Sequence, residues 1–477
     1  GLDEKEVFSK YANFKSYFYA VYNGANFNIK AHYPQWFAGN NQKFTMEGLT
    51  DMCDMTRIQR CQPGKQGDGS TVIYAVGYNS EAEIEAAREA AKAAGGGLSE
   101  IREAVAAAEA EATERVANMT IRNIDMLQDA TDREKKDLLA QAYFVRAYCH
   151  FELFRLYGSL PYIDKVMGSE DEWDLPRLSD YDMLQRIAAD FQTAADIFDQ
   201  AGLMRRDPAS GSGHLAATDQ DKPNGVTALA MKGRALLYSA SPLSNPGNDI
   251  SRWEEAAEAN WTALKSALDH GYLLLAKEKY TDNFYGTKYT NEQLWCYSVG
   301  NIALSNSRFY GRYGRAQCNN QNNASGICPT QNFVDRFETI WGDPLDTEED
   351  RAAAVALGHY NDQDPYADRD PRFDLTILHD GSKVGSKNVT VNIYKNTKGT
   401  WPTTTIGNAK NFGAEWEADP LRGTTRTGYY LNKGWNGERG NTAYRHSDPL
   451  IRMAELYLNY AEAVNEYAGP GGTAAGL

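Results

Sequence analysis

The feature that most constrains the fold of this chain is a series of amphipathic segments in which small residues alternate with large apolar ones. The segments cover residues 120–130, 133–158, 179–202, 227–242 and 252–271. Their apolar residues recur at three- and four-residue steps, which is typical of helices that bury one face. Alanine and glycine between tyrosine, leucine and phenylalanine allow close stacking, as in tetratricopeptide-like helix pairs, although the full repeat consensus is missing. We therefore predict a mostly α-helical scaffold of packed helix pairs.

One further helix is predicted at the start of the chain and one near its end. The apolar face of the first contains Val7, Tyr11, Phe14, Phe18 and Val21, and the Asn23-Gly24 step ends it. The apolar face of the last contains Ile451, Ala454, Leu458, Ala461 and Val464, and Gly469 to Gly471 end it. Within this last helix, Arg452 and Glu455 are expected to pair at i,i+3, and Ala454 and Ala461 are expected to allow the close approach of a neighbouring helix.

Residues 80–117 differ in composition from the rest of the chain. They consist almost wholly of Ala, Glu, Arg and Lys, with a break at Gly95 to Gly97 and a capping-box pattern at Ser80 and Glu83. We predict a helical hairpin on the surface, because few large apolar side chains are present to be buried. A natural low-complexity insertion and a designed replacement of a loop explain this composition equally well.

Two stretches, 26–79 and 272–447, lack helical periodicity. They are rich in Gly, Asn and Thr, and loops of such length are usually functional when they are ordered. Short strands are predicted in the second stretch at 293–299, 389–396 and 428–433. We expect one domain over 1–477, in which a first helix and long loop (1–79), a helix-pair scaffold (118–271) and a last scaffold helix (448–466) accompany an irregular ligand-binding half (272–447).

Charge and hydropathy exclude several classes of partner. The 477 residues include 64 acidic and 49 basic ones, for a net charge of −15, and such a field repels nucleic acid and anionic lipid. No run of about 18 apolar residues occurs, so no membrane-spanning helix is expected. The first residues of the chain do not have the pattern of a signal peptide, so an export signal or a lipid anchor could lie upstream of them.

The six cysteines form no CxxC pair, so a zinc or thioredoxin-type site is not indicated. Cys53 with Cys61, and Cys318 with Cys328, lie in loop-like surroundings, where a disulfide could pin each loop in an oxidising compartment. Cys149 lies within a helical apolar pattern and is expected to be a small buried side chain.

No catalytic or cofactor motif is present. The seven histidines show no HExxH spacing, and neither a GxSxG elbow nor a Walker loop occurs. The acidic run 362–374 lacks the central Gly and the closing Glu of a calcium loop, so we expect no metal and no cofactor. We predict a binding protein. A glycoside hydrolase stays an alternative, because 64 acidic residues could always supply a carboxylate pair.

Five phrases, taken together and in order, resemble the SusD/RagB family, the surface glycan-binding lipoproteins of the Bacteroidetes outer membrane. They are AQAYFVRAYCHFELFRLYGSLPYI (140–163), GRALLYSASPLSNP (233–246), DPYADRDPRFDLTILHDGS (364–382), TGYYLNKGW (427–435) and DPLIRMAELYLNYAEAVNE (448–466). The resemblance covers nearly the whole chain outside 80–117. In the first phrase, Gly158 is expected to end a helix in the left-handed conformation and Pro161 to prevent its continuation. In the third, Arg369 and Arg372 are expected to form a salt-bridged loop that braces the helical half against the irregular half.

The resemblance implies a helical platform of four tetratricopeptide-like units, with most of the ligand surface in the irregular half. It also implies a role in polysaccharide uptake, a lipid anchor upstream of Gly1, and a place on the extracellular face of the outer membrane. The partner that it implies is a SusC-like TonB-dependent transporter, which the binding protein covers as a lid. Composition and spacing show none of these properties.

A glycan site needs aromatic rings for the apolar faces of sugars, beside polar side chains that bond to the hydroxyls. Two loops, 33–78 and 301–328, fit this description, and family members generally draw ligand contacts from these two regions. The predicted ligand-binding residues are Tyr33, Trp36, Asn40, Asn41, Asp54, Arg57, Tyr74, Tyr310, Arg312, Tyr313, Asn319 and Asn320. Trp401 and Trp435 are secondary candidates.

Other tryptophans are expected to be structural: Trp295 in a strand, and Trp253 and Trp261 in a helix, are predicted to lie in the core. Trp341 is left without an assignment. The alternative function is that of a helical-repeat protein that binds a peptide or protein. A concave, charged, Asn-rich helical surface would favour that function, whereas a groove lined by Trp and Tyr with amide neighbours would favour sugar.

Overall fold

The structure is a computed structural model that describes residues 4–23, 36–37, 41–42, 53–55, 93, 114–168, 170–171, 174–206, 222–286, 289–299, 327–384, 389–391, 427–433 and 445–471. The predicted hairpin at 80–117 lies outside these residues except for residue 93 and residues 114–117, which are helical. The two possible disulfides, Cys53 to Cys61 and Cys318 to Cys328, also lie outside the described side chains. No described helix is long and apolar enough to cross a bilayer.

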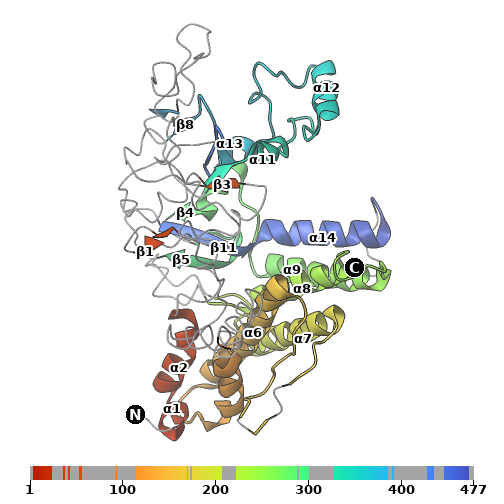
Figure 1. The fold of residues 1–477 in the computed structure, drawn as a ribbon. Helices are drawn as coiled ribbons and strands as arrows, with labels where there is room; N and C mark the ends of the chain where they lie inside the picture. Colours follow the sequence, from red (N-terminus) through yellow and green to blue (C-terminus); the bar gives the residue numbers. More distant parts are fainter. Residues whose placement is uncertain are drawn as a thin grey trace.

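Five helices form the scaffold as a layered stack (Figure 1). They are α6 (Asp132–Tyr157), α7 (Asp180–Gln200), α8 (Gly225–Ala240), α9 (Ile250–Asp269) and α14 (Met453–Ala468). Each of the first four packs against the next in the chain, and α14 packs on α9 from the far end of the sequence. The prediction of a mostly helical fold with packed helix pairs is therefore confirmed.

Local sequence signals set the ends of these helices. Thr131 and Glu134 form a complete capping box at the start of α6, which satisfies two backbone N–H groups that have no partner within the helix. Ser179 and Asn224 cap α7 and α8 through their side-chain oxygens. Gly158 ends α6 at φ +75°, as predicted, in a conformation that L side chains rarely adopt.

The start of the chain forms two helices, α1 (Glu4–Ser9) and α2 (Tyr11–Asn23). The predicted end at Asn23 is confirmed, but the break at Lys10 was not expected. At this break the carboxylate of Asp129 accepts a hydrogen bond from the backbone N–H of Tyr11 (2.6 Å). A contact from far along the chain therefore supplies a partner for one free N–H at the start of α2.

The core lies where the scaffold meets a small antiparallel sheet. This sheet has the order β4-β11-β5, with β4 at Tyr285–Gly286, β5 at Gln293–Val299 and β11 at Arg445–Arg452. Trp295 of β5 is buried and meets Phe144 of α6 edge-to-face, with 5.0 Å between ring centroids. Trp253 of α9 is buried as well, whereas Trp261 is only partly buried. The core assignment of Trp295 and Trp253 is confirmed.

The predicted face of the last helix is wrong. The buried residues of α14 include Met453, Leu456 and Val464, whereas Leu458 is 67% exposed. The helix begins only at Met453, because the preceding residues extend β11 alongside β5. A short stretch with apolar residues on several faces cannot by its own spacing show which face meets α9.

The predicted pair of Arg452 and Glu455 is replaced by two long-range pairs. Arg452 is extended (φ −141°), so its guanidinium reaches Glu292 (2.5 Å) instead of the next turn. Glu455 accepts two hydrogen bonds from Arg234 of α8 (2.6 and 2.7 Å). These contacts tie the last helix to the sheet and to the scaffold.

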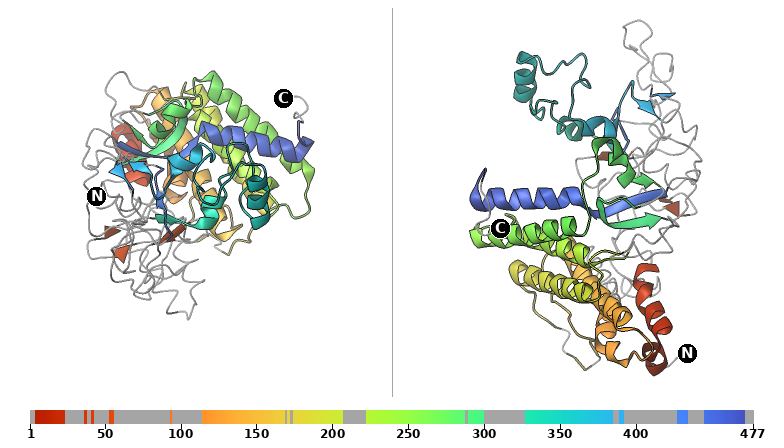
Figure 2. Two further views of the ribbon diagram at one scale, coloured as in Figure 1. Left: turned by 90° about the horizontal axis from the view of Figure 1, so that it is seen from above. Right: turned by 180° about the vertical axis from the view of Figure 1, so that it is seen from behind.

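Three short helices form an outcrop above the sheet, which we define as residues 331–376 (Figures 1 and 2). They are α11 (Gln331–Asp335), α12 (Glu348–Ala356) and α13 (Arg372–Thr376). The expectation that 272–447 holds no helix is therefore wrong. The α12 helix escaped prediction because Ala354 is its only buried residue, which leaves no apolar period to detect.

Arg369 braces the outcrop itself rather than the junction between the two halves of the chain, which corrects the expectation. Its buried guanidinium donates to the carbonyls of Val334 (2.7 Å), Phe337 (2.7 Å) and Pro365 (2.9 Å). Arg372 pairs locally with Asp370. The guanidinium thus satisfies three backbone acceptors at the end of α11 and in the loop that leads to α13.

Candidate functional site

The two loops predicted to bind ligand are joined by a pair of strands. Strand β3 (Cys53–Met55) belongs to the first loop, and strand β6 (Ile327–Pro329) closes the second. They pair antiparallel, with Asp54 opposite Cys328 and Met55 opposite Ile327. Two stretches more than 250 residues apart in sequence therefore share one backbone ladder. This is the geometry that a composite site from both loops requires.

A second ladder lies within the first loop. Strands β1 (Trp36–Phe37) and β2 (Asn41–Gln42) pair antiparallel, with Trp36 opposite Gln42 and Phe37 opposite Asn41. Two predicted site residues, Trp36 and Asn41, thus fall on one short hairpin as backbone positions. The side chains of Trp36, Asn41 and Asp54 are not among those that the structure describes. The other predicted site residues lie wholly outside the described residues: Tyr33, Asn40, Arg57, Tyr74, Tyr310, Arg312, Tyr313, Asn319 and Asn320. The secondary candidates Trp401 and Trp435 lie outside them too.

The base of the β3–β6 ladder is held by aromatic residues. Strand β6 lies next to β10 (Tyr430–Leu431), which pairs with β7 (Ile377–Leu378). The hydroxyl of Tyr429 donates to the side-chain oxygen of Gln331, two residues after β6 (2.8 Å). Burial and the neighbouring Tyr366 raise the pKa of Tyr429, so its hydroxyl keeps its proton across the physiological range. The chain just after β6 is therefore held by Tyr429, next to β10.

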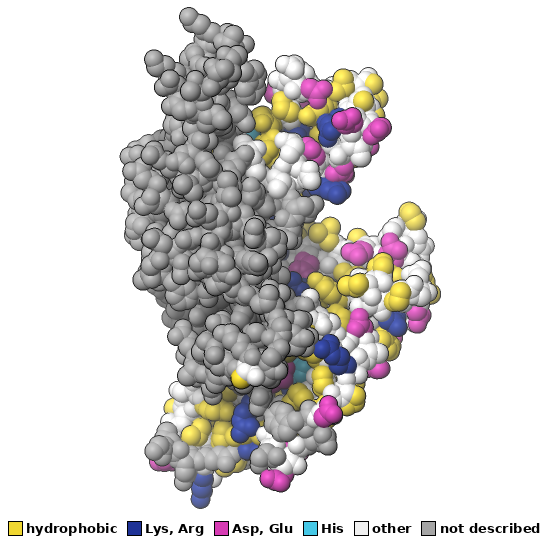
Figure 3. All heavy atoms as spheres, in the orientation of Figure 1, with side chains coloured by type: hydrophobic (Ala, Val, Ile, Leu, Met, Phe, Trp, Pro, Cys, Tyr) yellow, Lys and Arg dark blue, Asp and Glu magenta, His cyan; other side chains and the backbone are white. Residues whose placement is uncertain are grey.

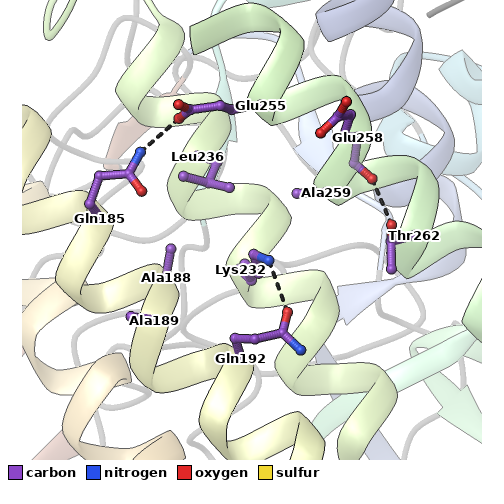
Figure 4. A pocket seen from close by; sticks show the side chains of 10 residues that line it. All are labelled: Gln185, Ala188, Ala189, Gln192, Lys232, Leu236, Glu255, Glu258, Ala259 and Thr262. Carbon is purple, nitrogen blue, oxygen red and sulfur yellow. Dashed lines mark hydrogen bonds between the residues drawn. The ribbon is translucent and has the colours of Figure 1, made fainter. Parts of the chain in front are cut away.

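A separate pocket of about 420 Å³ opens on the helical scaffold (Figure 4). Its floor consists of apolar side chains from α7, α8 and α9, including Ala188, Leu236 and Ala259. Two hydrogen bonds cross the rim, from Gln185 to Glu255 (2.7 Å) and from Lys232 to Gln192 (2.8 Å). Burial lowers the pKa of Lys232.

The chemistry of this pocket differs from that of a sugar platform. No aromatic ring is among its lining residues, which combine amides, carboxylates and one ammonium group. Such groups can bond to a peptide backbone or to charged side chains, but they offer no flat apolar surface for a sugar ring. The sequence does not predict this pocket, because it is formed by side chains that come together only when three helices stack.

Two family models match the chain. The model of the SusD family matches residues 291–475, and the model described as starch-binding associating with outer membrane matches residues 115–202. The SusD-like protein P2 of Formosa agariphila is 31% identical over 104 residues. That match spans 21% of this chain and 20% of the relative's length.

Solved structures show the same fold. A SusD-like protein from Bacteroides fragilis matches with a TM-score of 0.62 and 20% identity, over 98% of this chain and 77% of that one. Surface glycan-binding protein A from Bacteroides thetaiotaomicron, solved in complex with laminarihexaose, matches with a TM-score of 0.52 and 15% identity, over 97% of this chain and 80% of that one.

Stacked helix pairs that carry a loop-rich half with short strands define a SusD-like fold. The chain belongs to the SusD/RagB family, as its sequence phrases predicted. Binding proteins of the SusD family are non-catalytic, which agrees with the prediction of a binding protein. The description of the second model names starch binding and association with the outer membrane.

Proposed function

We propose that this chain is a non-catalytic cell-surface protein that binds an oligosaccharide or polysaccharide and delivers it to a SusC-like TonB-dependent transporter. The β3–β6 ladder carries the proposal, because it joins the two aromatic, amide-rich loops on one frame. The complex of a structural relative with laminarihexaose supports a glycan as the ligand class. We also propose that the whole chain acts as one domain, attached to the extracellular face of the outer membrane by a lipid anchor outside this chain.

The direct test is a panel of affinity gels at neutral pH, each containing one polysaccharide, with the release of reducing sugar measured alongside. We expect the protein to be retarded in at least one gel and to release no reducing sugar above background. Free migration in every gel would contradict glycan binding. Release of reducing sugar would contradict a purely binding role.

The pocket across α7, α8 and α9 favours a second candidate function, the binding of a peptide or of a transporter loop. Its amide and charged rim matches the polar groups of a polypeptide better than those of a sugar. A double variant, Gln185→Ala with Gln192→Ala, separates the two functions. If this pocket serves a polypeptide partner, the variant keeps its retention in polysaccharide gels and loses only its association with the purified transporter.

A further inference from the structure

Trp341 presents an open aromatic face on the outcrop, away from the predicted loops. It lies in the turn between α11 and α12, and its side chain is 54% exposed. The ring of His359 stacks on it, with 4.2 Å between centroids and 16° between planes. Since one face is covered by this stack and half of the residue is still exposed, the opposite face of the indole is open to solvent.

Hydrogen bonds fix the position of the stacking partner. Nδ1 of His359 donates to the carboxylate of Asp343 (2.8 Å), and that carboxylate also accepts from the hydroxyl of Thr339. The backbone of the turn is closed by bonds from Thr339 N to Asp343 O (3.0 Å) and from Ile340 N to Asp368 O (2.7 Å). The indole therefore lies on a rigid turn, and a rigid aromatic ring loses little entropy when a ligand binds.

The polar groups beside the indole suit hydroxyl ligands. The hydrogen bonds from Thr339 and His359 hold the pKa of Asp343 below its usual value, so its carboxylate is ionised at neutral pH and accepts hydrogen bonds. The carboxylate of Glu338 lies 3.8 Å from the Cβ position of Gly342, the residue that follows Trp341. Sugar hydroxyls are donors of this kind, and their rings offer CH faces to an aromatic plane.

The charge of the outcrop selects among sugars. Residues 331–376 contain 12 Asp and Glu against 4 Arg, and Figure 3 shows acidic side chains around the yellow apolar ones on this part of the surface. A surplus of negative charge on a small exposed element repels carboxylated or sulfated chains. A neutral polysaccharide is not repelled by this charge.

The outcrop is attached directly to the frame of the predicted site. Helix α11 begins two residues after β6, and Tyr429 beside β10 bonds to Gln331 at its start. Phe337 and Phe373 pack edge-to-face within the outcrop, with 5.6 Å between ring centroids. The outcrop that carries the indole is therefore connected to the β3–β6 ladder through α11.

We propose that Trp341, backed by His359, is a second contact site for a neutral polysaccharide, apart from the loops 33–78 and 301–328. This proposal builds on the proposed glycan-binding function. A long chain that reaches both places binds more tightly than a short one, because the second contact is intramolecular. An oligosaccharide too short to reach both places does not gain from this effect.

The test compares soluble starch and laminarin with maltohexaose and laminarihexaose, using wild type, Trp341→Ala, Trp341→Phe and the control Tyr457→Ala. Tyr457 is an exposed ring on α14, 38% accessible, outside the outcrop. For each polysaccharide that wild type binds, we expect the affinity of Trp341→Ala to be lower by about tenfold or more. Trp341→Phe should recover part of this loss, Tyr457→Ala should match wild type, and hexasaccharide affinity should stay the same in all four proteins. Equal polymer affinity of Trp341→Ala and wild type would overturn the proposal.

A second measurement separates this proposal from the proposed function. The protein is labelled with fluorotryptophan, the Trp341 resonance is assigned by its loss in Trp341→Phe, and each hexasaccharide is titrated to millimolar concentration. We expect the Trp341 resonance to shift, even in a variant that lacks the loop aromatics. No shift with either hexasaccharide would overturn the second site whatever the gels show. A shift without polymer retention by wild type would contradict the proposed function and leave the second site standing.

Discussion

Arg146 of α6 and Asp190 of α7 form a bidentate pair in the interior of the scaffold, with 2.6 Å from Nε to Oδ2 and 2.8 Å from Nη2 to Oδ1. Both residues are buried. Burial disfavours a charged guanidinium, but the hydrogen bonds and charge of Asp190 outweigh this effect and raise the pKa of Arg146. Asp190 also accepts from the hydroxyl of Tyr162 (2.6 Å). The pair joins two neighbouring helices of the stack.

Removing the acidic partner is expected to be costly. Asp190→Asn leaves the Arg146 charge buried without its counter-ion, and we expect the free energy of unfolding to fall by about 3–5 kcal/mol. Chemical denaturation followed by circular dichroism measures this change. The matched control is Asp125→Asn, because Asp125 pairs with Lys135 on the surface with a side chain that is 91% exposed. That variant should lose no more than about 1 kcal/mol, and equal losses in the two variants would contradict the account.

The stability of the scaffold should depend on pH through His150. Its Nδ1 donates to the carbonyl of Arg146 (2.8 Å) and its Nε2 accepts from the N–H of Ile163 (3.0 Å), which requires the neutral ring. Burial lowers its pKa to about 3, whereas the unfolded chain binds a proton near pH 6.5. The stabilisation is therefore complete above about pH 6.5 and is lost as the pH falls toward 3.

We expect this one residue to contribute a slope of up to about 1.4 kcal/mol per pH unit in that range. The carboxylate of Glu114, 3.3 Å from Nε2, would accept a hydrogen bond from the charged ring and thereby reduce the slope. Denaturation of wild type and His150→Asn at a series of pH values between 4 and 7 checks the prediction. The variant should be less stable at pH 7 and have a flatter profile. Parallel profiles would show that His150 is not the titrating group.

The contact between α8 and α9 depends on the absence of a side chain at Gly233. A Cβ there would lie 2.4 Å from Oδ1 of Asn260, which is fully buried and donates from Nδ2 to the carbonyl of Gly233 (3.0 Å). We expect Gly233→Ala to cost about 1–3 kcal/mol through overpacking, although alanine favours helix. Gly247→Ala is the control, because nothing lies within 4 Å of its Cβ position.

The double variant Gly233→Ala with Asn260→Ala should be more stable than the sum of its single losses predicts, because the shortened side chain makes room for the new methyl group. A thermodynamic cycle of the four proteins measures this coupling. If the two losses of unfolding free energy are strictly additive, the destabilisation by Gly233→Ala does not come from the contact with Asn260.

Arg369 is expected to determine the local stability of the outcrop. Arg369→Lys keeps the charge but cannot hold the carbonyls of Val334, Phe337 and Pro365 with one planar group. We expect hydrogen exchange in residues 334–340 to speed up by about tenfold, which corresponds to about 1.4 kcal/mol. Arg336→Lys, an exposed arginine on the same element, is the control. Equal exchange in both variants would contradict this role.

The scaffold helices and the family could be predicted from the sequence because their signals are local. The predicted strand 293–299 also matches β5 residue for residue. Contacts across the fold determine which face of α14 is buried, which residue pairs with Glu455 and where Trp341 lies. The spacing of residues along one segment does not encode such contacts. The pocket across three helices has no local signal at all. The loops 33–78 and 301–328 were selected by composition, and their meeting at β3 and β6 is a tertiary property.

We propose that the loops on the β3–β6 frame bind a glycan without catalysis. The decisive experiment compares retention in polysaccharide-affinity gels of wild type, Tyr457→Ala and the triple variant Trp36→Ala, Tyr310→Ala and Tyr313→Ala. We predict that the triple variant migrates as if no polysaccharide were present, with a melting temperature close to that of wild type. Unchanged retention of the triple variant would contradict the claim.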